Sequence, residues 1–143
     1  MQRMIFVNLP VENLEKSKAF YQSLGFTNES RFTDETAACM VLSETIFVMI
    51  LTHDKWRTFT TRPIPTPDSS EVMLCVSCES RQEVDSFADT AGKNGGTTDI
   101  NPLQDHGFMF SRSFADPDGH IWEGMWMDPA VANGEAHVSD AEA

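Results

Sequence analysis

Residues 5–25 decide the order of the fold and read IFVNLPVENLEKSKAFYQSLG. Residues 5–11 alternate in the way typical of a strand that buries one face. Asn13 is a preferred residue at the start of a helix, and residues 14–24 carry an apolar stripe at helical spacing. Gly25 stands where a helix often ends in left-handed backbone. The stretch therefore predicts a strand followed directly by an amphipathic helix.

The same order returns in the second half of the chain. Residues 71–78 alternate as a strand, and Ser80-Arg81-Gln82-Glu83 forms a capping box, which typically starts a helix. The residues that follow repeat the apolar helical stripe as far as Asn94-Gly95-Gly96. Glu12 and Glu79 each close a strand just before its helix. The sequence therefore predicts an internal repeat.

Each predicted helix is followed by further strand candidates. Asp116-Pro117-Asp118-Gly119 is a strong turn signal between the last two of them, because Pro fixes φ and Gly accepts positive φ. The strand candidates are 26–32, 37–42, 46–52, 97–101, 108–115 and 120–127. A βαβββ order therefore occurs twice, and we predict an α+β fold.

The domain boundaries follow from this repeat. The first module covers residues 1–52 and the second covers residues 71–127. Residues 53–70 contain Pro63, Pro65 and Pro67, which are incompatible with regular structure, and form a linker. Residues 128–143 lack an apolar period and are predicted to be a flexible acidic tail.

Length and charge limit the possible functions. The chain has 143 residues, of which 41% are hydrophobic, and a formal net charge of −12. This composition predicts a packed core. A strongly acidic surface repels nucleic acid and anionic membranes, and no apolar run approaches the ~18 residues of a membrane span. We expect a cytoplasmic protein that binds neither nucleic acid nor membranes.

The cysteines predict neither disulfides nor a metal site. The count is three, which is odd, and no export signal accompanies them. Cys75 and Cys78 have C-x-x-C spacing within a predicted strand, where residues three apart point to opposite faces. We expect Cys39, Cys75 and Cys78 to be buried thiols.

Two motifs carry a resemblance to a known superfamily. They are FYQSLGF at residues 20–26 and FADPDGHIWE at residues 114–123. With the duplicated βαβββ order, they resemble the glyoxalase/bleomycin resistance/dioxygenase proteins, also called vicinal oxygen chelate proteins, over residues 4–127. The resemblance implies curved mixed sheets around a cavity, in a homodimer.

The resemblance also implies where a metal would bind. In metal-dependent relatives, four inward side chains hold a divalent cation, and these positions fall on Phe6, Ile50 (or Met49 if the register shifts by one), Met73 and Glu123. Only Glu123 offers an oxygen donor. We therefore expect no metal and no other cofactor. As an alternative, Asn8, Thr52 and Glu71 form a displaced metal site with Glu123.

These residues predict a protein that binds a small apolar or aromatic molecule in a metal-free cavity. The candidate lining residues are Phe6, Asn8, Ile50, Met73, Phe108, Phe110 and Met125. Glu123 is the candidate catalytic residue, as a proton acceptor or donor. In the alternative view, a backbone donor or Arg112 holds Glu123 in a purely structural role, and the apolar residues are core.

Another alternative is a divalent-metal-dependent lyase, isomerase or dioxygenase resembling lactoylglutathione lyase. A third is a metal-free enzyme that uses Glu123 as its acid or base.

Overall fold

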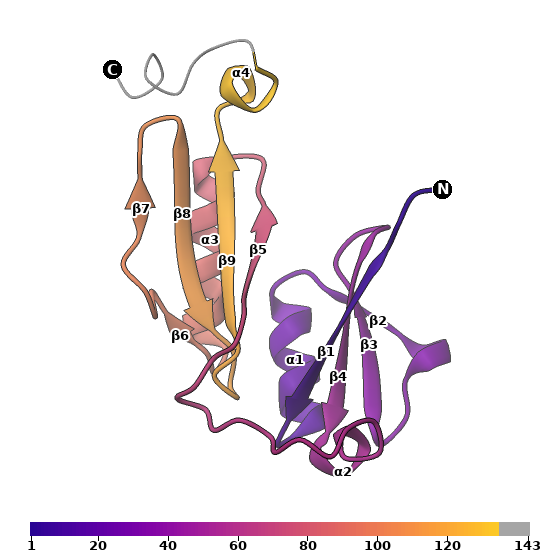
Figure 1. The fold of residues 1–143 in the computed structure, drawn as a ribbon. Helices are drawn as coiled ribbons and strands as arrows, with labels where there is room; N and C mark the ends of the chain where they lie inside the picture. The colour runs from indigo at the N-terminus through magenta and orange to yellow at the C-terminus, as the bar shows by residue number, and fades with distance from the viewer. Residues whose placement is uncertain (135–143) are drawn as a thin grey trace. The chain divides into compact units, whose positions relative to one another are not determined.

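The computed structural model describes residues 1–134, and the chain divides into two compact units (Figure 1). Unit 1 comprises residues 1–69 and 117–120. Unit 2 comprises residues 70–116 and, in the described part of the chain, residues 121–134. Within residues 1–134, no helix has both the length and the apolar character needed to cross a bilayer.

Unit 1 contains one mixed four-stranded sheet in the order β1-β4-β3-β2. Strands β1 and β4 are parallel, and the other pairs are antiparallel. The elements are β1 (Ile5–Val11), α1 (Leu14–Ser23), β2 (Thr27–Glu29), the 3-10 helix η1 (Ser30–Phe32), β3 (Ala37–Val41), β4 (Ile46–Thr52) and α2 (His53–Trp56).

Unit 2 repeats this plan with a sheet in the order β5-β9-β8-β6 and with β7 paired to β8. Here β5 and β9 form the parallel pair. The elements are β5 (Met73–Ser77), α3 (Arg81–Lys93), β6 (Thr97–Thr98), β7 (Gln104–Asp105), β8 (Met109–Ala115), β9 (Ile121–Met127) and α4 (Pro129–Ala132). The predicted α+β class with two mixed sheets is confirmed. The first part of the predicted flexible tail, residues 128–143, forms the helix α4. The remaining residues, 135–143, lie outside the described part of the chain.

The helix starts follow the predicted capping residues. The Asn13 side chain accepts a hydrogen bond from the Lys16 amide at 3.0 Å, and this bond caps α1. The Ser80 hydroxyl accepts from the Glu83 amide at 3.1 Å at the start of α3. These bonds satisfy amides that have no partner within the helix. Both helix starts are thereby confirmed.

Three predicted strands are shorter than their patterns indicate. The strand predicted at 71–78 covers only Met73–Ser77. The strand predicted at 26–32 ends at Glu29, because the Glu29 carboxylate accepts from the Arg31 amide at 3.1 Å and begins the η1 turn. The strand predicted at 97–101 ends at Thr98, because Asp99 adopts a φ of 53°. Left-handed backbone at a non-glycine residue interrupts a strand.

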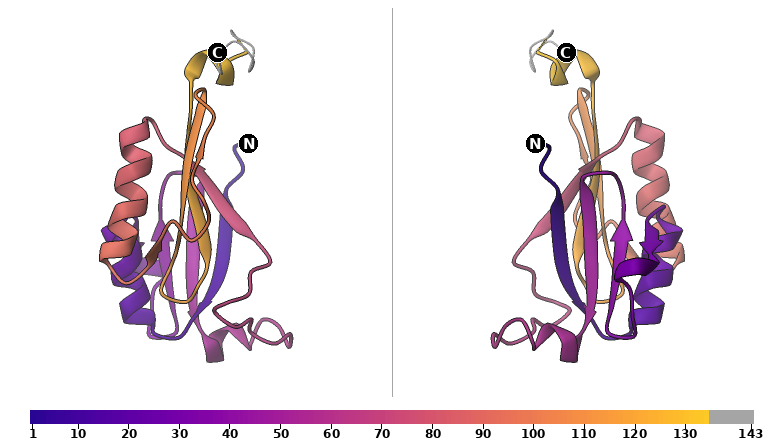
Figure 2. Two further views of the ribbon diagram at one scale, coloured as in Figure 1. Left: turned by 90° about the vertical axis from the view of Figure 1, so that its left-hand side faces the viewer. Right: turned by 90° about the vertical axis from the view of Figure 1, so that its right-hand side faces the viewer.

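Helix α1 covers one face of the first sheet (Figure 2). The strand register brings Leu9, Ile50 and Ala38 side by side, and all three are buried. From α1 and the segment after it, Tyr21 contacts Phe26 edge-on at 5.2 Å between ring centroids. Burial of this apolar face against the helix is the main source of stability for the unit.

Helix α3 covers one face of the second sheet in the same way (Figure 2). Trp122 is 1% exposed, and the Phe87 ring meets the Phe114 ring edge-on at 5.0 Å. A side chain at Gly124 would come within 3.1 Å of both Cys78 and Phe87. Gly124 therefore allows α3 to lie close against β9.

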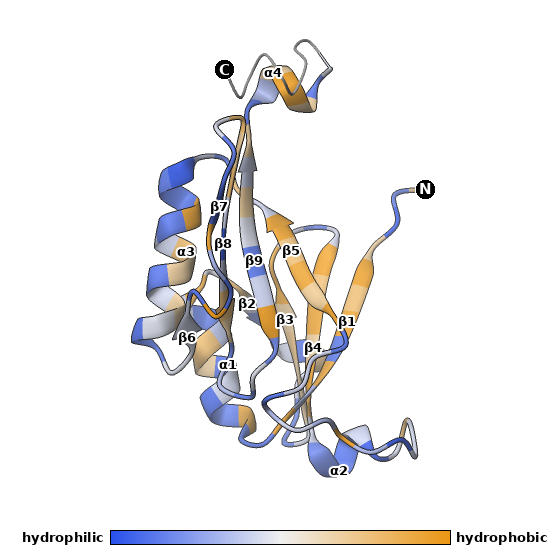
Figure 3. Cartoon of the chain, turned by 60° about the vertical axis from the view of Figure 1, so that its left-hand side comes forward, coloured by the Kyte–Doolittle hydropathy of each residue, from blue (hydrophilic) through white to orange (hydrophobic). Residues whose placement is uncertain are grey.

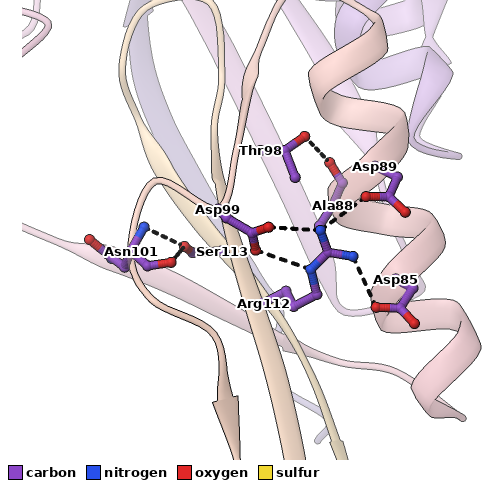
Figure 4. A network of polar contacts seen from close by, with 8 residues as sticks. All are labelled: Asp85, Ala88, Asp89, Thr98, Asp99, Asn101, Arg112 and Ser113. Carbon is purple, nitrogen blue, oxygen red and sulfur yellow. Dashed lines mark hydrogen bonds and ion pairs between the residues drawn. The ribbon is translucent and has the colours of Figure 1, made fainter.

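A partly buried arginine joins α3 to the strands of unit 2 (Figure 4). The Arg112 guanidinium, with its side chain 12% exposed, pairs with Asp85 at 2.9 Å, Asp89 at 3.0 Å and Asp99 at 2.8 Å. The hydrogen bonds to Asp99 contribute most to raising the pKa of Arg112 and lower the pKa of Asp99. Three carboxylates thus form ion pairs with the same guanidinium.

A buried hydroxyl in α1 predicts a stabilising substitution. Ser17 is 1% exposed, and its Oγ has no hydrogen-bond partner among the described residues. An unpaired buried hydroxyl costs about 1–3 kcal/mol. We therefore expect Ser17→Ala to raise the free energy of unfolding by about 1 kcal/mol, measured by urea denaturation.

A second serine of the same helix provides the control. The Ser23 hydroxyl donates a 2.5 Å hydrogen bond to the Phe20 carbonyl, so Ser23→Ala should lower the free energy of unfolding. A loss of stability in Ser17→Ala would show that its hydroxyl has a partner in solution.

Candidate functional site

The first sheet has one face that α1 does not cover. Side chains alternate along a strand, so the buried residues Leu9 and Ile50 place their neighbours on the opposite face. On that helix-free face, the Phe6 ring stacks on the Phe47 ring at 4.6 Å between centroids. Phe6 is nevertheless 51% exposed. This face therefore presents an accessible aromatic surface.

The second sheet also has a helix-free face. Gly124 faces α3, so Glu123 must point to the other side of β9. The register then assigns the remaining residues of this face. They are Met73, Cys75 and Ser77 from β5, Met109, Ser111, Ser113 and Ala115 from β8, and Ile121, Glu123, Met125 and Met127 from β9. We call this set the methionine face.

Glu123 lies in the middle of the methionine face. It is half-buried, and the strand register sets it between Cys75 on β5 and Ser113 on β8. Within residues 1–134, no ion pair or hydrogen bond joins its carboxylate to another side chain, and no other residue of the methionine face is charged. Burial, with a further contribution from the Glu123 charge, raises the pKa of the Cys75 thiol.

Arg112 does not hold Glu123, in contrast to what the structural alternative predicts for this arginine. Ser113 is the residue opposite Glu123, so its neighbour Arg112 lies on the face toward α3. The guanidinium is fully engaged there by aspartates. Glu123 therefore faces the methionine surface without this cation.

The other predicted site residues divide between the faces. Met73 and Met125 lie with Glu123 on the methionine face, and Phe6 and Asn8 lie on the helix-free face of the first sheet. Ile50 does not: it is fully buried and shares the α1 face with Leu9. Met49 takes the position on the helix-free face, as the alternative register predicted.

The two predicted phenylalanines near β8 lie away from the methionine face. Phe110 alternates with Ser111 and faces α3, where the Arg81 guanidinium stands 5.0 Å from its ring centroid. Phe108 precedes β8, and its ring lies 6.2 Å from that of His106. The sequence analysis also missed Met127, which alternation from Glu123 along β9 finds, and Met109, which is found only through its pairing with Met127.

The implied metal positions do not fit a divalent cation. In the structure they carry Phe6, Met49, Met73 and a single carboxylate, Glu123, and Phe and Met offer no suitable hard donor. Within residues 1–134, no three His, Cys, Asp or Glu side chains come together as ligands.

The displaced metal set fails in the first sheet. Asn8 lies opposite Met49 on the helix-free face, whereas Thr52 belongs to the other face. The Thr52 hydroxyl is already used, because it accepts from the Lys55 amide at 3.2 Å and caps α2. Asn8 and Thr52 therefore cannot share one ion.

The C-x-x-C cysteines lie apart, as alternation predicts. Cys75 is on the methionine face, whereas the Cys78 sulfur lies beside Gly124 on the face of the sheet that α3 covers. Burial raises the pKa of Cys78 to about 11, so it stays a protonated thiol at neutral pH. Cys39 is buried as predicted, but Cys75 is exposed and Cys78 is only partly buried.

Unit 1 also contains a polar cleft of about 370 Å³ at the start of α1, lined by Glu12, Asn13, Lys16, Pro117 and Asp118. The Asp118 carboxylate accepts from the Glu12 amide at 2.8 Å there, and His120 Nε2 lies 2.7 Å from the Pro10 carbonyl oxygen. These bonds fix the turn at residues 117–120 within unit 1.

Comparison with known proteins identifies the fold. A family described as bleomycin resistance protein-like, N-terminal, matches residues 3–43. No curated protein sequence matches the chain significantly. A hypothetical protein from S. aureus is similar in structure, with a TM-score of 0.74, 22% identity and coverage of 88% of this chain and 94% of that chain.

Two further solved structures are also similar to this chain. A glyoxalase/bleomycin resistance protein/dioxygenase family enzyme from Burkholderia phytofirmans PsJN has a TM-score of 0.72 and 14% identity, with coverage of 88% and 99%. Fosfomycin resistance protein FosX from Mesorhizobium loti has a TM-score of 0.66 and 14% identity, with coverage of 93% and 98%. The resemblance inferred from the motifs is confirmed.

Proposed function

Because this chain has the fold of the glyoxalase/bleomycin resistance protein/dioxygenase proteins, we propose that it binds a small apolar or aromatic molecule on the helix-free face of a sheet, without a divalent metal and as a homodimer. One observation carries this proposal. Phe6, Met49 and Met73 occupy the places where metal-dependent relatives are expected to carry donors.

The chemistry of these faces suits an apolar ligand. Phe6 is 51% exposed and Met73 is 56% exposed, so the apolar surface of both side chains is accessible to a ligand. Strands β1, β4 and β5 are coloured mostly hydrophobic in Figure 3. Methionine adapts its shape to irregular ligands, and each Å² of apolar surface removed from water contributes about 25 cal/mol.

The proposal is tested with 4-phenylbutan-1-ol as a neutral aromatic probe in isothermal titration calorimetry. On the sheet face where the probe binds, we expect the alanine substitution (Phe6→Ala on the first sheet, Met73→Ala on the second) to raise the Kd by about three- to tenfold, because it removes apolar contact area. Phe32→Ala is the matched control, since Phe32 is 62% exposed in the η1 turn and outside both faces. Equal Kd values in all variants would contradict the proposal.

Native mass spectrometry with excess Zn(II), Ni(II) and Mn(II) tests the metal and the oligomer together. We expect a dimer whose mass does not increase by one metal per site. A bound ion that is lost in Glu123→Gln would overturn the metal-free proposal and favour the lyase, isomerase or dioxygenase alternative.

A further inference from the structure

Glu123 gives the methionine face an unbalanced negative charge. Glu123 is half-buried between Cys75 and Ser113, and within residues 1–134 its carboxylate forms no ion pair with a basic side chain. Partial removal of a carboxylate from water costs free energy unless a donor or a positive charge compensates for it. A ligand that brings its own positive charge would provide this compensation.

The two arginines of unit 2 are committed elsewhere. Arg112 points toward α3 and is held by Asp85, Asp89 and Asp99. Arg81 forms a two-pronged pair with Asp105 at 3.0 Å and stands over the Phe110 ring. Neither guanidinium is free to neutralise Glu123.

The surroundings of Glu123 are apolar or already paired. Met73, Met109, Met125 and Met127 share its face. The Ser113 hydroxyl beside it donates to the Asn101 carbonyl at 3.2 Å and accepts from the Asn101 amide at 2.9 Å. The face therefore offers one negative charge within a thioether surface, which complements an apolar body with a single cationic group.

We infer that the methionine face binds a lipophilic cation, a small molecule with an apolar or aromatic body and one protonated nitrogen that pairs with Glu123. This inference rests on the proposed function and names its ligand class. The net charge of −12 acts in the same direction, because it attracts cations and repels anions.

Three probes of one shape test the charge preference. They are 4-phenylbutylamine, which is a cation at pH 7, 4-phenylbutan-1-ol, which is neutral, and 4-phenylbutanoate, which is an anion. We expect calorimetry with the wild-type protein to show the amine binding about tenfold more tightly than the alcohol, and the alcohol more tightly than the acid. A charge-assisted hydrogen bond in a half-buried site supports a difference of this size.

Glu123→Gln keeps the shape of the side chain and removes its charge. We expect its amine Kd to rise about tenfold and its alcohol Kd to stay unchanged. The control Glu44→Gln removes one charge from an exposed turn of unit 1, so it changes the net charge equally without touching the methionine face. Glu44→Gln should leave the Kd of each probe within twofold of its wild-type value.

The outcomes separate this inference from the proposed function. If the wild-type protein binds amine and alcohol equally, the cation inference is overturned and apolar binding stands. The same conclusion follows if Glu44→Gln weakens the amine as much as Glu123→Gln does. If no probe binds, the proposed function fails and the inference fails with it. The wild-type series decides the question even where Glu123→Gln does not fold.

Discussion

An Arg112→Leu variant should lose about 3 kcal/mol of its free energy of unfolding. The Arg112 side chain is 12% exposed, and its guanidinium is the shared partner of Asp85, Asp89 and Asp99 (Figure 4). Removal of one member of a buried ion pair costs about 3–5 kcal/mol, because the remaining charge stays desolvated. The three carboxylates are 39–52% exposed, so water recovers part of that loss. Urea denaturation at pH 7 measures the difference.

Arg57→Leu is the matched control for this substitution. Arg57 forms an ion pair with Asp54 at 3.4 Å, but its side chain is 60% exposed and that of Asp54 is 100% exposed. An exposed pair contributes at most about 1 kcal/mol. If both variants lose the same stability, the Arg112 network does not hold α3 to its sheet.

The pH dependence of the Arg112→Leu effect follows from Asp99. The Arg112 hydrogen bonds hold the pKa of Asp99 below its ordinary value of 3.8. A carboxyl with a lowered folded-state pKa stabilises the fold above its unfolded pKa, and this stability disappears as the pH falls through the folded pKa. The difference in free energy of unfolding between the wild type and Arg112→Leu should therefore have its full size above about pH 5 and decrease below about pH 4.

The element order was predictable because its signals are local. Asn13 and Ser80 cap the two long helices with bonds to the amides three residues later. The apolar stripes that follow need only the 3.6-residue period of the helix. Turn signals such as Asp116-Pro117-Asp118-Gly119 are local in the same sense. The strand ends at Glu29 and Asp99 were missed because a side-chain bond and a left-handed residue override the alternation there.

The faces of the strands were harder to predict because they depend on pairing between distant residues. Ile50 was expected on the ligand face, but it pairs with Leu9 toward α1. A shift of one residue in register exchanges the two faces of a strand. The pattern of β4 alone therefore cannot decide whether Met49 or Ile50 lies on the ligand face. The Arg112 network was missed for the same reason, since its aspartates come from α3 and from the segment after β6.

A Gly119→Ala variant should lose about 3 kcal/mol of stability. Gly119 has a φ of 89°, which costs a residue with a side chain about 1–2 kcal/mol. An added methyl group would also overlap the Pro67 carbonyl oxygen, which is backbone and cannot rotate away. Both residues belong to unit 1, so the overlap must be relieved by moving the turn or the linker. Thermal and urea denaturation measure the loss.

Gly25→Ala separates the two causes of that loss. Gly25 has a similar φ of 95°, but an added side chain there meets no atom within 4 Å. We expect Gly25→Ala to cost about 1 kcal/mol, from the backbone conformation alone. The remaining loss in Gly119→Ala then measures how firmly Asp118 and His120 hold the turn against β1 through the Glu12 amide and the Pro10 carbonyl. Equal losses would mean that the turn moves away from Pro67 at no cost, and that these two bonds do not fix its position.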